Sequence, residues 1–104
     1  MVFLLVVRPP KKVGTSRDLP ANYKRYFKAL GHKIRSLRTE RGLSQEDMIS
    51  HGYSVRHWQM IEAGRPFTLF TLLRISETFG VSPERILTGL ASHLRKTGKS
   101  PGKT

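Results

Sequence analysis

Two helix starts lie ten residues apart in the middle of this chain, with a glycine between them. Ser44 and Ser54 each precede a helical pattern, and a serine there accepts hydrogen bonds from free N–H groups of the first turn. Asp47 follows Ser44 by three residues, which resembles a capping box with Asp in place of Glu. Gly52 tolerates the positive φ of a tight turn. The spacing therefore predicts two short helices, at about 44–51 and 54–63, joined by a turn.

Helical spacing extends on both sides of this pair. Before it, apolar residues recur every three or four positions and predict a helix at about 21–41, formed on Tyr23, Phe27, Leu30, Ile34 and Leu37. Gly31 should weaken this helix by about 1 kcal/mol relative to alanine, so we expect a kink or break there. After the pair, Thr68 and Gly80 should begin and end a fourth helix, with core residues Leu69, Leu72, Leu73, Ile75 and Phe79.

A fifth short helix follows the fourth. Ser82, Pro83 and Glu84 supply a cap, a first-turn proline and a first-turn acid, and Ile86, Leu87 and Leu90 complete it. In the central pair we expect Met48, Ile49, Trp58 and Ile61 to point inward. The sequence therefore predicts an all-α fold, a compact five-helix domain at 20–90.

Positive charge is concentrated at the two ends of the chain. The net charge is +12, and residues 1–39 hold ten Lys and Arg against one Asp, whereas residues 85–104 hold five and no acid. Residues 40–84 hold four Arg against six acids. We expect a flexible apolar and basic arm at 1–19 and a disordered basic tail at 91–104. Such arms commonly bind polyanions, and nucleic acid is the leading candidate over a merely solubilising charge run.

The first seven residues, Met-Val-Phe-Leu-Leu-Val-Val, are apolar. They are too few for a membrane span, which needs about 20 apolar residues, and they lack the pattern of a signal peptide. An edge strand, a dimerisation arm, a disordered tail and a start codon placed too far upstream stay open for this segment. The chain also has no cysteine, which removes disulfides and thiolate chemistry and fits a cytoplasmic protein.

Several short motifs, in order, resemble the lambda repressor/Cro-type helix-turn-helix family, also called Xre-type. The strongest are Leu-Ser-Gln-Glu at 43–46 and Ile-Glu-Ala-Gly at 61–64. Others are Leu-Arg-Thr-Glu-Arg-Gly at 37–42, Thr-Leu-Leu-Arg-Ile at 71–75 and Phe-Gly-Val-Ser at 79–82. The resemblance covers about 34–87. It implies that the helix at 54–63 enters the DNA major groove.

The resemblance also implies which residues bind DNA. They are Gln45, Ser54, Val55, Arg56, His57, Gln59, Met60 and Arg65. Helical geometry supports part of this set independently, since inward Trp58 and Ile61 leave positions 55, 56, 59 and 60 on the outer face.

The side chains suit base recognition. Arg56 can bond guanine O6 and N7, Gln59 can pair with adenine N6 and N7, and the apolar side chains of Val55 and Met60 can contact a thymine methyl. His57 can serve a phosphate or a guanine. Gln45 would touch a phosphate or brace the recognition helix, and Ser54 would bind phosphate through its helix N-terminus.

Arg38 and Glu62 have a different implied role. In this family they look like the structural pair that fastens the first helix to the recognition helix. Trp58 is expected in the core and not as a platform for a base.

We therefore expect a DNA-binding transcriptional regulator, cytoplasmic or on the nucleoid, forming a homodimer on a palindromic site of double-stranded DNA. A protein-binding adaptor, with Tyr53, Val55 and Met60 as exposed contacts, and an antitoxin with a partner-binding tail are the alternatives. We expect no enzyme, no catalytic residues, no cofactor and no metal, because the four histidines and the scattered acids show no ligand spacing or nucleophile motif.

Overall fold

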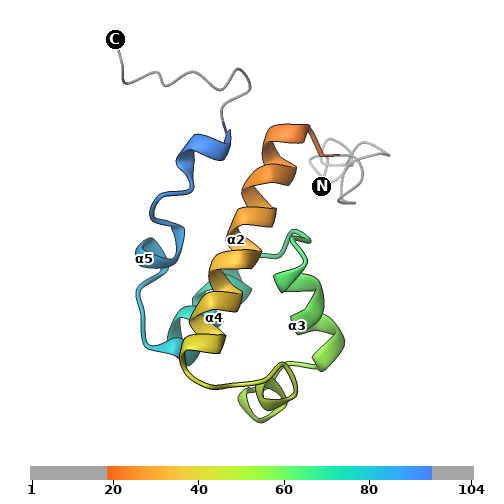
Figure 1. Cartoon of the computed structure of the whole chain (residues 1–104), viewed down its shortest axis with the longest axis vertical. Coiled ribbons are helices and arrows are strands. Elements are labelled where there is room, and N and C mark those ends of the chain that lie inside the picture. The colour runs from red at the N-terminus through yellow and green to blue at the C-terminus, as the bar shows by residue number, and fades with distance from the viewer. Residues whose placement is uncertain (1–18, 95–104) are drawn as a thin grey trace, which may run out of the picture.

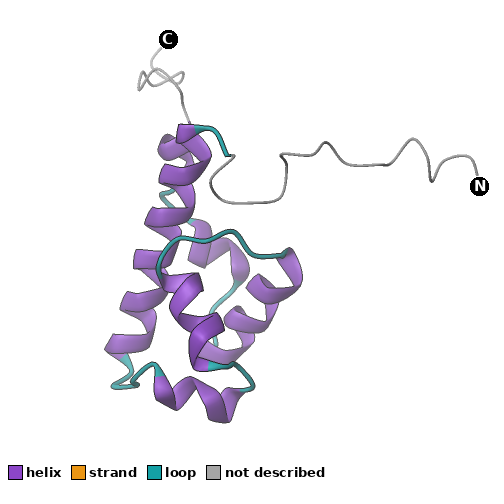
Figure 2. Cartoon of the chain, turned by 90° about the vertical axis from the view of Figure 1, so that its right-hand side faces the viewer, coloured by secondary structure: helices purple, strands orange, loops and turns teal. Residues whose placement is uncertain are grey.

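The computed structural model describes residues 19–94, and every regular element in that range is a helix (Figures 1 and 2). Their order is α2 (Ala21–Glu40), the 3₁₀ helix η2 (Glu46–His51), α3 (Val55–Glu62), α4 (Leu69–Phe79), α5 (Pro83–Leu87) and the 3₁₀ helix η3 (Ala91–Leu94). The all-α fold expected from the sequence is confirmed.

Helix α2 runs through the middle of the molecule and contacts α3, α5 and η3 (Figure 1). It follows Pro20 and is continuous over 20 residues, so Gly31 does not break it. A β-carbon at Gly31 would lie only 2.6 Å from the carbonyl oxygen of Glu62 and 2.8 Å from that of Ile61. Gly31 therefore lets the end of α3 approach the backbone of α2, and α3 covers it.

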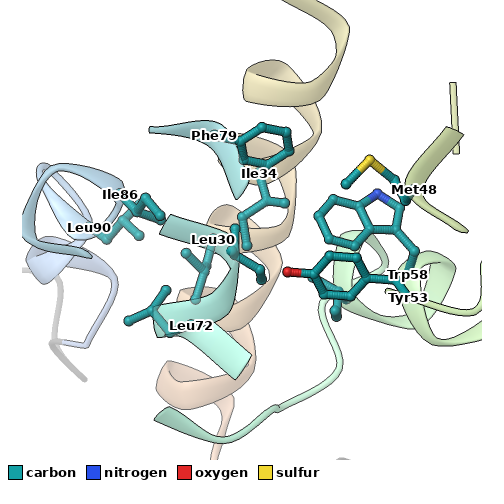
Figure 3. Packing of buried hydrophobic residues seen from close by; sticks show 11 residues of the cluster. Leu30, Ile34, Met48, Tyr53, Trp58, Leu72, Phe79, Ile86 and Leu90 are labelled. Carbon is teal, nitrogen blue, oxygen red and sulfur yellow. The ribbon is translucent and has the colours of Figure 1, made fainter. Parts of the chain in front are cut away.

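The core lies where α2, α3, α4 and α5 meet (Figure 3). Trp58 is fully buried, as expected, and its ring makes edge-to-face contacts with Tyr53 and Phe79 at centroid distances of 4.8 and 6.0 Å. Met48 packs beside them (Figure 3), so η2 is fixed through a single fully buried side chain.

Four apolar residues expected in the core are instead exposed. They are Tyr23, Ile49, Leu69 and Leu73. On α4 the buried positions are Thr71, Leu72, Ile75, Ser76 and Phe79. Two polar residues occupy this inner stripe because their hydroxyls bond locally: Ser76 Oγ donates to the Leu73 carbonyl at 2.7 Å, and Thr71 Oγ1 bonds Thr68 Oγ1 at 3.2 Å.

The described part of the chain continues beyond α5 to Leu94. Leu90 is buried, although α5 itself ends at Leu87. Residues 91–94, expected to begin a disordered tail, form η3, and the side-chain amide of Asn22 donates to the Leu94 carbonyl at 2.7 Å. This bond fastens η3 to the first turns of α2.

Candidate nucleic-acid interface

A tight turn connects η2 to α3. Gly52 has φ 95°, in the left-handed region, and its N–H donates to the Ile49 carbonyl. Ser54 then caps α3, because its Oγ accepts from the His57 N–H at 3.0 Å. The capping box at η2 is also confirmed: Asp47 N–H donates to Ser44 Oγ at 3.0 Å, and Ser44 N–H donates to Asp47 Oδ2 at 2.7 Å. Serine caps therefore position both helices of the pair, although the first is a 3₁₀ helix and not the α-helix that starts at Ser44.

The outer surface of α3 brings together most of the residues expected to bind DNA. Arg56, His57 and Gln59 are exposed, and Val55 and Met60 are half-buried. Ser54 at its start and Arg65 just beyond its end are exposed as well. Trp58 and Ile61 hold the opposite face against the core. Helix α3 thus presents one continuous surface of cationic, amide and apolar side chains.

The carboxylate of Glu62 joins α3 to its neighbours. It accepts from Arg38 Nε at 2.6 Å and Arg38 Nη2 at 2.9 Å, so the two form a bidentate ion pair. Both side chains are buried, at 8% exposure for Arg38 and 4% for Glu62. Arg38 Nη1 donates in addition to the Leu43 carbonyl at 2.7 Å. The pair therefore fastens α3 to the C-terminal part of α2 and to the chain that leads into η2.

The same carboxylate accepts two further hydrogen bonds. One comes from Trp58 Nε1 and the other from Gln45 Nε2, at 3.0 Å. Gln45 Oε1 in turn accepts from Gln59 Nε2 at 3.3 Å. A row of polar contacts thus runs from the buried Arg38 to Gln59 on the outer surface. Gln45 is placed as a brace of α3, one of the two roles considered for it.

These contacts set the charge states within the row. Burial raises the pKa of Glu62, and hydrogen bonds from Arg38, Gln45 and Trp58 lower it. The hydrogen bonds together outweigh burial, so the pKa of Glu62 lies below its usual value. The hydrogen bond to Glu62 is the main cause of a raised pKa for Arg38. The pair is therefore ionised at neutral pH, and the carboxylate can hold all its donors.

Two glycines allow close backbone contact between α2 and the end of α3, and the sequence pattern did not predict either contact. Gly31 faces the carbonyls that end α3, and Gly64 has φ 97° and lies beside the Lys28 backbone, where a β-carbon would be 3.0 Å from Lys28 Cα. A glycine within an amphipathic pattern is a weak sign of such a close approach. Its partner was not predictable, because the contact depends on how the two helices cross.

Tyr53 is not the exposed residue that the adaptor interpretation required. It is 3% exposed, its hydroxyl bonds Thr78 Oγ1 at 3.2 Å, and the Arg74 guanidinium lies 4.7 Å from its ring centroid. Tyr53 thus belongs to the packing of the turn against α4. Of the three contacts named for an adaptor, only Val55 and Met60 remain, and both are half-buried.

The cations of the predicted basic arms lie outside the described residues. They include Lys11, Lys12, Arg17, Arg95, Lys96, Lys99 and Lys103. Between residues 19 and 94, no three or more His, Asp or Glu side chains are grouped so that they could hold a metal ion. In that same range, no helix combines the length and apolar character needed to cross a bilayer.

Comparison with known proteins identifies the fold. A family model described as a helix-turn-helix domain matches residues 29–88, more than half of the chain, and includes η2, the turn and α3. Neither the curated proteins nor the solved structures gave a match. The matched region contains the capped pair of helices, the Arg38–Glu62 pair and the exposed face of α3. The chain belongs to the helix-turn-helix domain family.

Proposed function

We propose that this chain is a sequence-specific transcriptional regulator that reads the major groove of double-stranded DNA with α3. The observation that carries this proposal is the outer face of α3, fastened to α2 and η2 through the buried carboxylate of Glu62. A rigid support of this kind fits base recognition, because hydrogen bonds to base edges require side chains held in a defined register.

The side chains on this face have the chemistry that base edges require. Arg56 is exposed and can donate two hydrogen bonds to guanine O6 and N7. Gln59 uses one N–H on Gln45, which leaves its other N–H and its carbonyl oxygen for adenine N7 and N6. Val55 and Met60 offer apolar contacts to a thymine methyl.

Phosphate contacts would come from the ends of the two helices. In the first turn of α3, the N–H groups of Val55 and Arg56 have no partner within the helix and could bind a phosphate. Gln45 keeps one N–H beyond the bond to Glu62. Arg65 is exposed past the other end of α3. With His57, these groups would position the protein on the backbone, and the basic arms would add salt-sensitive affinity.

The finer assignment also belongs to this proposal. The quoted motifs favour the lambda repressor/Cro type, and such proteins typically occupy inverted repeats as homodimers whose recognition helices lie one DNA turn apart. We propose that this chain does the same, and that it acts in the cytoplasm on nucleoid DNA without catalysing a reaction.

Selection of bound duplexes from a random pool tests the proposal. At about 150 mM salt, non-specific phosphate binding is weakened and sequence-specific binding persists. We expect one enriched inverted repeat, which the Arg56→Ala variant fails to enrich and the Arg35→Ala variant, changed on the exposed side of α2, enriches normally. Binding without any sequence preference would reject the regulator in favour of a protein-binding adaptor, whereas an antitoxin that regulates its own gene would be distinguished by a neighbouring toxin gene.

A further inference from the structure

Helix α4 carries an apolar surface that no other element between residues 19 and 94 covers. Leu69, Phe70 and Leu73 are 67%, 68% and 44% exposed. Their positions fall within an arc of about 100° on the helix, opposite the buried residues Leu72, Ile75 and Phe79. We call these three side chains the α4 patch. They are half of the exposed large apolar residues between positions 19 and 94, so their grouping on two turns of one helix requires an explanation.

We infer that the α4 patch is the surface through which a second copy of this chain binds when two copies occupy one DNA site. This inference rests on the proposed function. Arg74 of α4 donates to the Gly52 carbonyl at 3.2 Å, so α4 lies beside the turn from which the recognition helix begins. A two-fold contact through α4 would pair the two copies symmetrically, as the two halves of an inverted repeat require.

Charge favours a second copy over other occupants. The chain carries a net charge of +12, and α2 exposes Lys24, Lys28 and Arg35, so most approaches between two copies are repulsive. The α4 patch is uncharged, and the nearby guanidinium of Arg74 lies over Tyr53 and donates to the Gly52 carbonyl. Two identical patches can therefore meet without bringing like charges together.

The remaining charge on the outer face of α4 also fits a symmetric pair. Glu77 lies one turn beyond Leu73 and is exposed. If two α4 helices cross antiparallel at Leu73, Glu77 of each copy lies opposite the first turn of the other α4. A carboxylate is stabilised at a helix N-terminus, so this contact would favour the antiparallel orientation.

The size of the patch predicts a weak contact. At roughly 200 Å² for a fully exposed side chain of this size, the three exposures amount to on the order of 300 Å² per copy. A stable dimer buries about 1,200–2,000 Å² in total. The patch alone is too small for a permanent dimer, whereas it suffices once DNA holds two copies side by side and raises their effective concentration.

Disulfide trapping tests the inference without DNA, so the result does not depend on the proposed function. The chain has no cysteine, and a cysteine placed near a two-fold axis forms a disulfide when the two β-carbons come within about 4.5 Å. We would oxidise full-length Phe70→Cys and Leu73→Cys proteins at about 1 mM, a concentration at which a weak dimer is populated. The matched control is Ile49→Cys, also exposed and apolar but on η2.

We expect at least one of the two α4 variants to form covalent dimers about tenfold faster than the Ile49→Cys control. Adding Phe70→Ser to the Leu73→Cys protein should remove most of this difference. Equal rates at the α4 and η2 positions would overturn the inference. A rate on α4 that changes strongly with Leu4→Ser and Leu5→Ser would also overturn it, because the apolar N-terminal segment would then be the occupant.

Discussion

For the replacement of Gly31 by alanine, the structure and the helical sequence pattern predict opposite changes in stability. Within a regular helix this change should stabilise the protein by about 1 kcal/mol, because alanine is the better helix former. The structure predicts the opposite, since the new methyl group would lie 2.6 Å from the Glu62 carbonyl oxygen and 2.8 Å from that of Ile61. Both are backbone atoms, so α3 as a whole must move away from α2.

That movement has a cost that can be estimated. Overpacking costs about 1–3 kcal/mol, and loosening the charged hydrogen bonds between Arg38 and Glu62 adds roughly 1.5–3 kcal/mol. After subtracting the helix gain, we expect a net loss of about 2 kcal/mol or more. The melting temperature would fall by roughly 10 °C, at about 4–8 °C per kcal/mol for a domain of this size.

Thermal unfolding followed by circular dichroism gives the answer. His32→Ala is the matched control, because His32 is the next residue along α2 and is exposed. It should melt at or slightly above the wild-type temperature. A Gly31→Ala protein as stable as wild type would show that α3 does not cross α2 as closely as described, and the reasoning would fail.

Three further perturbations test the contacts around α3 and η3. Arg38→Ala leaves the Glu62 carboxylate buried without its main partner and should cost about 3–5 kcal/mol in urea unfolding, whereas Arg35→Ala should change little. Because the pKa of Glu62 is lowered in the folded state, its stabilisation is complete above the ordinary pKa of about 4.3 and is lost as the pH falls through the folded value. Glu62→Gln should therefore flatten the fall in stability below about pH 4.3, and an unchanged acid profile would contradict the assignment. Asn22→Ala should speed amide hydrogen exchange at residues 91–94 alone, and exchange that stays slow there would exclude the Asn22–Leu94 bond as the fastening.

Much of the fold follows from local signals in the sequence. Serine and threonine caps at Ser54, Thr68 and Ser82 begin their helices where the pattern predicted, because a cap depends only on the residues of one turn. The burial of Trp58 also followed from its spacing to Ile61. The type of η2 did not, because over six residues the i+3 and i+4 spacings of a 3₁₀ helix and an α-helix cannot be distinguished.

The sequence-based predictions that were wrong concern which side chains are buried. Leu69 and Leu73 suggested one stripe on α4, whereas the inner stripe includes Thr71 and Ser76, whose hydroxyls are satisfied within the helix. Tyr53 was expected outside, yet the turn at Gly52 directs it between Trp58 and Arg74. Such choices depend on packing between distant segments, which a pattern along one helix does not contain.

The outer face of α3 could be predicted from the sequence, because it depends on residues of one helix only. Its two inward residues fix the rotation of the helix, and the remaining positions are then assigned by the 3.6-residue period. The hydrogen bonds that Gln45 donates to Glu62 and Gln59 donates to Gln45 were not derivable, because they join side chains 17 and 14 residues apart.

The most direct test of the central proposal, that α3 reads bases, is the sequence preference of the Arg56→Ala protein measured beside wild type on the same pool of duplexes. Arg56 is exposed and contributes no core contact, so the variant should melt like wild type. The account predicts that it loses the preference, with a guanine contact worth about 1–3 kcal/mol removed from each half-site. A variant that melts normally and retains the full wild-type preference would contradict the account.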